Sequence, residues 1–282
     1  CIRDSGRLDH GRGGLMNALA MGWERTLLEL KMYSREKEAV FFNFLFPILL
    51  LVMFSTIFGG QFSAADKAAG MNAGRLFLPG LIAAGVMLTS FQTMAMSVTV
   101  ERDDGTLKRL RGTPMPPVAY FLGKVGLVLA TSVAQLIALL LVARFLYDVQ
   151  LPTDAGRWLT LAWVFFLGSF GGTVLGIAYS SLGTARSIGA VVIAPALVLQ
   201  FISGVYFAFK DIPSWLQQVA AIFPLKWVAQ GMRSVFYPDA LASQEMAHAW
   251  EPGRTAIVLG LWAIGGLLLC AKTFSWYKRG TT

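Results

Sequence analysis

Six long stretches without a charged residue constrain what this chain can fold into. They cover residues 39–65, 76–100, 125–143, 158–185, 187–209 and 255–271, and each is 17 to 28 residues long. An α-helix needs about 20 mainly apolar residues to cross the bilayer core, with a range of roughly 17–25. Buried helices of a soluble protein would carry polar stripes, and these stretches carry almost none. The sequence therefore predicts an all-α membrane protein with six transmembrane helices.

The composition agrees with this class, because 55% of the residues are hydrophobic and only 14% are charged, against about a quarter charged in soluble domains. If the N-terminus is cytoplasmic, 16 of the 24 Lys and Arg residues lie on the inner side and 8 on the outer side. Inner loops of membrane proteins are enriched in Lys and Arg. The distribution predicts that both termini are cytoplasmic. The net charge of +8 then reflects topology rather than nucleic-acid binding.

The chain before the first apolar stretch divides into two parts. Residues 1–14 are rich in Gly and Arg and are predicted to be a flexible tail. Residues 15–38 carry apolar side chains at helical spacing, with Trp23 among them. This pattern predicts an amphipathic interfacial helix on the inner membrane surface or, alternatively, a helix packed on another subunit. A six-span transmembrane domain over residues 39–273 and a cytoplasmic tail over residues 274–282 follow.

The densest cluster of charge, residues 101–117, separates the second and third apolar stretches. A loop of this composition cannot lie in lipid, so it projects into water. Leu107 and Leu110 fall three residues apart, on one face of a short predicted helix. Asp103 or Asp104 can cap this helix, and three prolines stop it. Two interpretations remain open: a rigid knob that docks on a partner protein, or a solvated basic loop that only sets topology.

Several uncharged residues within the apolar stretches are also candidates for a role. Four amide side chains could line a substrate pathway, or each could be buried against a neighbouring span: Asn43, Gln92, Gln135 and Gln200. In the fourth stretch a small residue recurs every four positions, at Gly168, Gly172 and Gly176. This repeat predicts a face on which another helix packs closely.

Residues 210–250 are predicted to form an outer re-entrant helical hairpin. Two short apolar helical stretches meet at Pro224, and the second carries Arg233. Neither stretch is long enough to span the bilayer, so each would be half inserted and protected by protein. An ordinary solvated outer loop is the alternative.

The sequence shows no motif for catalysis or nucleotide binding. It has no G-x-x-x-x-G-K-[ST] run, and its two histidines lack metal-ligand spacing. The centres of the apolar stretches hold none of the ionisable residues that ion-coupled transporters keep there. We therefore expect a chain that is not an enzyme, binds no metal or cofactor, and is driven from outside the membrane domain.

One run of residues carries a resemblance to a known family. The run is Glu101-Arg-Asp-Asp-Gly105-Thr106-Leu107-x-x-Leu110-Arg111-x-Thr113-Pro114, followed by Gly123-Lys124. It resembles the signature of the ABC transporter type 2 permeases, the membrane subunits of bacterial drug, lipid and polysaccharide exporters. The resemblance extends over about residues 16–278 and favours the daunorubicin-exporter-like branch.

The resemblance implies that the charged loop is a coupling helix inserted into a separate ABC nucleotide-binding (ATPase) subunit, which binds ATP and Mg. It implies that Glu101 anchors the inner end of the second span. It also implies a pathway formed with a second permease copy or a paralogue, in the plasma (inner) membrane of a bacterium. The docking residues implied in this way are Glu101, Gly105, Thr106, Leu107, Leu110, Arg111 and Pro114.

The expected function is that of a multi-pass permease subunit of an ATP-driven exporter, which moves a lipophilic or amphipathic drug, lipid or glycolipid outward. A membrane-embedded channel or enzyme that ATP does not drive is one alternative. A subunit of an ABC-type sodium or polysaccharide exporter is the other.

Overall fold

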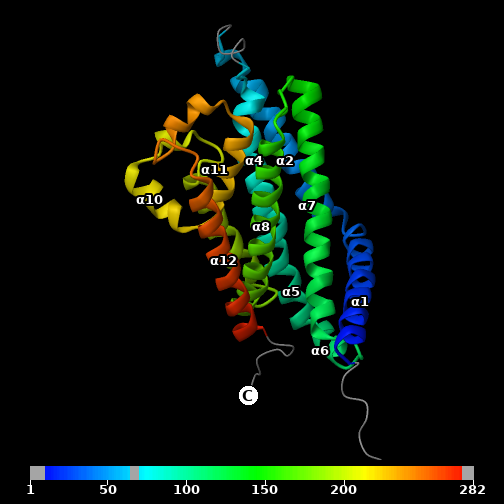
Figure 1. Ribbon diagram of the computed structural model, residues 1–282. Helices are drawn as coiled ribbons and strands as arrows, with labels where there is room; N and C mark the ends of the chain where they lie inside the picture. The colour runs from blue at the N-terminus through cyan, green and yellow to red at the C-terminus, as the bar shows by residue number, and fades with distance from the viewer. Residues whose placement is uncertain (1–9, 64–69, 275–282) are drawn as a thin grey trace, which may run out of the picture.

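The computed structural model describes residues 10–63 and 70–274 (Figure 1). Within these residues every regular element is a helix, which confirms the all-α prediction. The long elements are α1 (His10–Tyr33), α2 (Lys37–Phe58), α4 (Ala73–Val86), α5 (Thr93–Asp103), α7 (Pro117–Tyr147), α8 (Ala155–Tyr179), α9 (Ile188–Ile202), α11 (Pro224–Phe236) and α12 (Pro252–Thr273). The short ones are η1 (Gly59–Gln61), η2 (Met87–Gln92), α6 (Thr106–Arg111), η3 (Ser180–Leu182), η4 (Phe209–Asp211), α10 (Ser214–Ile222) and η5 (Asp239–Gln244).

Five helical segments of the described chain are long and apolar enough to cross a membrane. They are Lys37–Gln61, Ala73–Asp103, Pro117–Tyr147, Ala155–Leu182 and Pro252–Thr273. The predicted fifth span, residues 187–209, contains only α9, which has 15 residues. At about 1.5 Å per residue such a helix falls short of the roughly 30 Å bilayer core. The stretch is interrupted by a turn at Gly204, whose φ of 72° ends the helical path.

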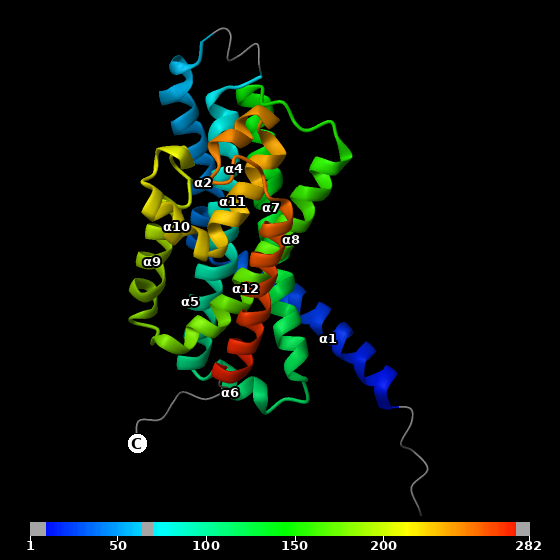
Figure 2. The same cartoon turned by 60° about the vertical axis from the view of Figure 1, so that its left-hand side comes forward.

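The helices form an elongated bundle with two different ends (Figure 1; Figure 2). α6 and the last turn of α12 lie at one end, here called the α6 end. α10 and α11 lie in the opposite half, here called the α10 half. Elements from the middle and the end of the sequence therefore surround the α4–α8 pair in that half.

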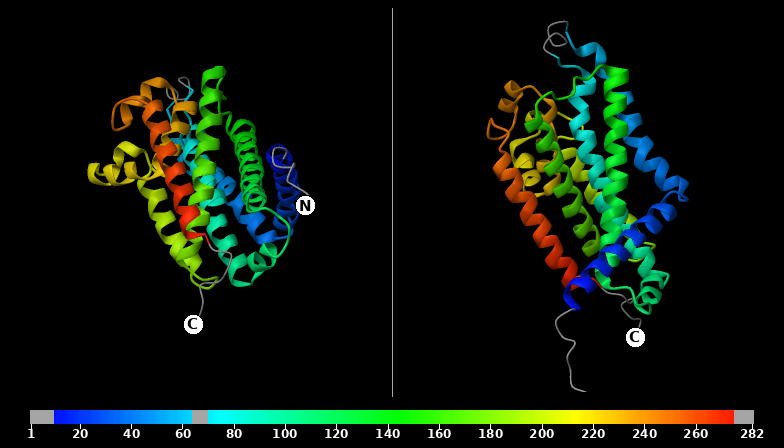
Figure 3. Two further views of the ribbon diagram at one scale, coloured as in Figure 1. Left: turned by 60° about the horizontal axis from the view of Figure 1, so that its bottom comes forward. Right: turned by 45° about the vertical axis from the view of Figure 1, so that its right-hand side comes forward.

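α1 lies obliquely against α7 near the α6 end (Figure 3). Glycines on α7 permit the close approach: a Cβ atom at Gly123 would lie 2.3 Å from Arg25 Cγ, and one at Gly126 would lie 2.3 Å from Thr26 Oγ1. The other face of α1 is apolar and exposed, with Trp23 62% accessible. α1 begins at His10, inside the segment predicted as a flexible tail, while residues 1–9 and the predicted tail at 275–282 lie outside the described residues.

The second candidate span is interrupted at mid-length by a π-helical segment, η2. Such segments are defined by backbone hydrogen bonds between residues i and i+5. Here the Leu88 carbonyl accepts the Thr93 backbone N–H and also a 3.0 Å hydrogen bond from the Thr93 hydroxyl. The glycine face of α8 packs against this segment: an added Cβ would lie 2.1 Å from Ser90 Oγ at Gly172, and 2.6 Å from the Phe91 carbonyl oxygen at Gly176.

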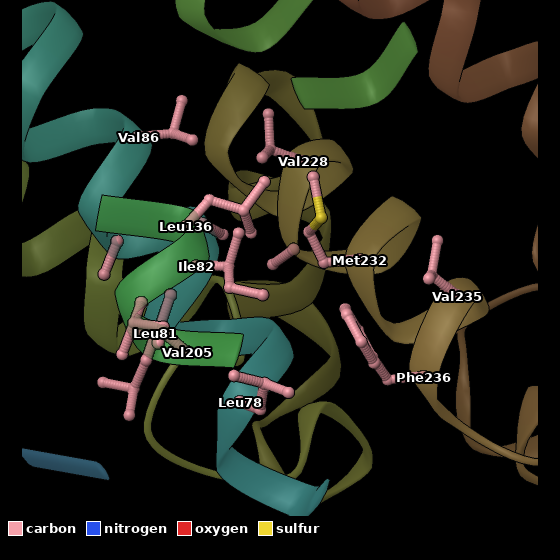
Figure 4. Packing of buried hydrophobic residues seen from close by; sticks show 14 of the residues in the cluster. Leu78, Leu81, Ile82, Val86, Leu136, Val205, Val228, Met232, Val235 and Phe236 are labelled. Atoms are coloured by element: carbon pink, nitrogen blue, oxygen red, sulfur yellow. The ribbon is translucent and has the colours of Figure 1, made fainter. Parts of the chain in front are cut away.

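The main apolar core lies in the α10 half and is built by α4 and α11 with α7 and α8 (Figure 4). α11 is buried along nearly its whole length, including Lys226, Gln230 and Arg233. α10, in contrast, buries only Ala220. The two helices of the predicted hairpin therefore differ, because α11 is a core element and α10 covers it from outside.

Replacing Gly176 with Ala should destabilise the protein, because the new methyl group would overlap a backbone carbonyl that cannot rotate away. Overpacking of this kind costs about 1–3 kcal/mol. The matched control is Gly260→Ala in α12, where an added Cβ meets nothing within 4 Å. Thermal unfolding in detergent should show a lower Tm for Gly176→Ala alone, and equal Tm values for both variants would contradict the packing.

Candidate functional site

The charged loop at the α6 end is a folded element rather than an extended loop. α5 ends at Asp103, and Gly105 turns the chain with a φ of 80°, a conformation that glycine adopts without strain. Asp104 Oδ1 then accepts a 2.8 Å hydrogen bond from the Thr106 amide at the start of α6. Pro117 occupies the first turn of α7, so the loop re-enters the bundle in a defined direction.

α6 has a buried face and an exposed face. Leu107 is 0% exposed and packs in a cluster with Val98, Tyr120 and Cys270. This corrects the expectation that Leu107 meets a partner: an apolar pair three residues apart defines a face but not what covers it, and here α5, α7 and α12 cover it. Leu110 is half-buried beside the same cluster. The exposed residues of the loop are Asp104, Lys108, Arg109, Arg111, Gly112, Thr113, Pro114 and Pro117, while Gly105 and Thr106 are half-buried.

A buried ion cluster connects the base of α6 to α1 and α7. It consists of Arg25, Glu29, Glu101 and Lys124, each at most 8% exposed. Lys124 Nζ lies 3.0 Å from Glu29 Oε2 and also pairs with Glu101 Oε1. Arg25 Nη2 lies 2.5 Å from Glu29 Oε1. The Tyr120 hydroxyl donates a 2.9 Å hydrogen bond to Glu101 Oε2. Two cations and two carboxylates thus compensate one another where a lone charge would be costly.

This cluster is the main feature that the sequence analysis missed. Lys124 was treated as the boundary before the third apolar stretch, but α7 begins at Pro117 and places Lys124 two turns inside the helix. Glu101 was expected among the docking residues, and in the structure it is 8% exposed and pairs with Lys124 inside the bundle. The available signal was the i, i+4 spacing of Arg25 and Glu29 on a helix otherwise predicted to lie at the membrane surface.

The segment between α8 and α9 is held at the α6 end by hydrogen bonds with α5. Arg102 donates hydrogen bonds to the carbonyls of Ser180 (2.8 Å) and Gly183 (2.7 Å). Asp103 Oδ2 accepts a 2.8 Å bond from the Ala185 amide. The base of α6 is therefore held by contacts from α1, α5, α7 and the α8–α9 connection.

In the α10 half, α11 carries polar groups into the core. Arg233 Nε lies 2.6 Å from Glu245 Oε1, and Arg233 Nη1 donates to the Gly204 carbonyl over 3.1 Å. Lys226 Nζ donates a hydrogen bond to Gln230 Oε1 and lies 3.9 Å from the centre of the Trp227 ring. Pro224 starts α11 at the first helical turn.

Two arginines donate hydrogen bonds to the backbone carbonyls at the C-terminal end of α11. The last carbonyls of a helix have no partner within it. Arg75, at the start of α4, donates to the Phe236 carbonyl. Arg157, at the start of α8, donates to the carbonyls of Val235 (3.2 Å) and Tyr237 (2.8 Å). Cations at a helix C-terminus also interact favourably with its dipole.

The four predicted pathway amides are each at most 8% exposed: Asn43, Gln92, Gln135 and Gln200. Asn43 donates to the Tyr33 hydroxyl (2.7 Å), and Gln135 accepts from Thr89 (3.1 Å). None of the four lines either of the two cavities described here, of about 550 and 160 Å³. In the single chain they are buried against neighbouring helices, which is the alternative that the sequence left open.

The fold and this site define a class: a multi-pass membrane protein whose second and third spans are joined by a short, firmly mounted helix at one end. Residues 23–237 match the sequence profile of the ABC-2 type transporter family. The chain therefore belongs to this family, whose members are membrane subunits of ABC exporters and work with an ABC ATPase subunit.

Two relatives agree with this assignment. The chain is 25% identical over 232 residues to the daunorubicin resistance ABC transporter permease protein DrrB1 of Streptomyces coeruleorubidus, covering 81% of this chain and 72% of the relative. It is 31% identical over 170 residues to YbhR of Escherichia coli K12, described as a probable multidrug ABC transporter permease, covering 58% of this chain and 44% of the relative.

Replacing Lys124 with Met should unfold the protein more easily, because Glu29 and Glu101 would share the interior without their common cation. Loss of one partner from a buried ion pair costs about 3–5 kcal/mol. Lys108→Met, on the exposed face of α6, is the control and should leave thermal unfolding unchanged.

A second substitution distinguishes charge from packing at this position. Adding Glu101→Gln to Lys124→Met leaves Arg25 and Glu29 as a neutral pair and should restore much of the lost stability. If the double variant loses as much stability as Lys124→Met and Glu101→Gln lose separately, added together, then charge compensation is not what the cluster supplies.

Proposed function

We propose that this chain is the permease subunit of an ATP-driven exporter that moves a lipophilic or amphipathic molecule out of the cytoplasm or inner leaflet of a bacterial plasma membrane. ATP and Mg are bound by the separate ATPase subunit. The observation that carries the proposal is α6, a helix with a basic exposed face in a family whose members work with an ATPase subunit. The drug-related names of the two relatives support an amphipathic substrate.

The contacts that hold α6 in the bundle support its role as the element on which the ATPase subunit exerts force. Its exposed face presents Lys108 and Arg109 to a partner, while Leu107 holds the opposite face in the bundle. Because Lys124 joins Glu29 and Glu101 directly behind it, a displacement of α6 would move α1, α5 and α7 as one unit. Force applied at the exposed face would then reach the spans without being absorbed by a flexible loop.

We assign the α6 end to the cytoplasm, on the excess of basic residues expected there. In this orientation α1 lies at the inner membrane surface, with its exposed face, which includes Trp23, in contact with lipid. α9, too short to cross alone, would complete a sixth crossing together with the segment that follows it and α10, and α11 would be inserted from the outer side under the protection of its neighbours. The buried length of α11 supports this depth, since its backbone needs no contact with lipid.

Reversing the charge of Lys108 and Arg109 together should weaken association with the co-expressed ATPase subunit by at least about tenfold, since complementary charge guides such contacts. Substrate-stimulated ATP hydrolysis should fall with it. Both residues are exposed, so the thermal stability of the permease alone should not change. Co-purification and ATPase assays measure the two effects.

The matched control is Arg144→Glu, an exposed residue at the far end of α7. It should leave co-purification intact. A Lys108→Glu/Arg109→Glu variant that still co-purifies and hydrolyses ATP at the normal stimulated rate would remove α6 as the docking element.

We also propose that two permeases, either copies or paralogues, act together. α2 and α9 each carry a row of exposed large apolar side chains, among them Phe42 and Ile57 on α2, and Ile193 and Val198 on α9. Native mass spectrometry of the purified complex should show two permease chains with two ATPase subunits. A complex with one permease chain would contradict this arrangement.

A further inference from the structure

We propose that an aromatic cavity in the α10 half binds one amphipathic small molecule with a flat apolar body and a polar end that both donates and accepts hydrogen bonds. The cavity has a volume of about 550 Å³, within the roughly 300–1,000 Å³ of small-molecule sites. It lies between α2, the first turn of α4, the end of α9 and the segment 204–211, on the side of the bundle where Figure 2 shows α2 and α9.

The wall of this aromatic cavity is a connected set of rings from separate segments. The Phe54 ring lies 4.9 Å from Phe77 and 6.1 Å from Tyr206, measured between centroids. Tyr206 in turn lies 5.3 Å from Phe201. Phe207, at the rim, is 58% exposed. Rings in contact in offset and edge-to-face arrangements offer continuous surface to a planar apolar body.

The polar part of the lining is the buried Arg233–Glu245 pair. Their side chains are 6% and 3% exposed, and both residues line the cavity. After all hydrogen bonds within residues 10–63 and 70–274 are made, Arg233 Nη2 and Glu245 Oε2 still have no partner. Buried polar atoms in native proteins are almost always paired, so this unpaired donor and this unpaired acceptor, each with less than 1 Å² exposed, need partners. A ligand group with an acceptor for Arg233 and a donor for Glu245 would supply both once the two side chains turn toward the cavity that they line.

This polar end distinguishes a small amphiphile from other occupants. An acyl chain or the apolar face of a second permease copy could cover the rings, but neither would satisfy the open positions on Arg233 and Glu245. The inference deepens the proposed export function, on which it rests, by placing a substrate site and its chemistry in the half of the bundle away from α6.

The test uses the purified full chain in lipid nanodiscs and rhodamine 123, a probe with a flat aromatic body, amino donors and an ester carbonyl. Fluorescence anisotropy measures the Kd. Phe207→Ala, at the exposed rim, should raise the Kd about 3- to 10-fold through loss of one ring contact. Ala208→Trp, which fills the cavity, should abolish saturable binding, and Glu245→Gln should weaken it. The controls are Phe145→Ala, 76% exposed on α7, and Ala155→Trp, exposed at the start of α8.

Unchanged binding by Phe207→Ala and Ala208→Trp, or equal losses in the controls, would overturn the proposal. So would an Ala208→Trp variant that separates the permease chains in native mass spectrometry while probe affinity stays normal, because the cavity would then be a subunit interface. Variant-sensitive binding in a chain that associates with no ATPase subunit would support the site and refute the exporter. Insensitive binding in a chain that does associate would refute the site alone.

Discussion

The contact between Lys124 and its two carboxylates is the interaction on which the α6 end depends. Glu29 belongs to a helix outside the apolar stretches, and Glu101 lies in the last turn of the second candidate span. Without the lysine, the Glu29 and Glu101 carboxylates would both be buried at this junction with Arg25 as the one remaining cation of the cluster. The glycines at positions 123 and 126 allow the approach, and the charges make it favourable. The ion cluster also fixes the position of α6, because Tyr120 bonds Glu101 and packs in the apolar cluster that contains Leu107.

Much of the architecture could be predicted because lipid excludes charge so strongly. Uncharged stretches predicted the five long candidate spans, and the glycine repeat on α8 falls where α8 packs closely against η2. The short α9 could not be predicted in this way. The residues after it are uncharged, and what ends the helix is backbone geometry at Gly204, which composition does not reveal.

The candidate site was predicted in position but not in orientation. The charge density of the loop and the prolines after it indicated a short folded element, and the structure has a helix there, α6. Which face of α6 is free depends on Ile177 and Cys270, which lie far along the chain and pack with Leu107. The ion cluster was missed for a related reason: a lysine at the edge of an apolar stretch is normally a marker of solvent. Only a partner 95 positions earlier in the chain, Glu29, makes its burial favourable.

The hydrogen bonds from Arg75 and Arg157 to the end of α11 restrict where the helices of the bundle can separate. Arg75 and Arg157 hold consecutive carbonyls of one helix end from two different spans, so α4 and α8 are tied together there through α11. Parting them at that level would strip three carbonyls of their donors at once. Toward the α6 end the same two spans meet through the glycine face and η2, and Arg102 ties their ends together by donating a 2.8 Å hydrogen bond to the Ser180 carbonyl. Arginine-to-carbonyl contacts therefore hold the second and fourth spans at both ends, and a rotation of one span against the other would break hydrogen bonds at each end.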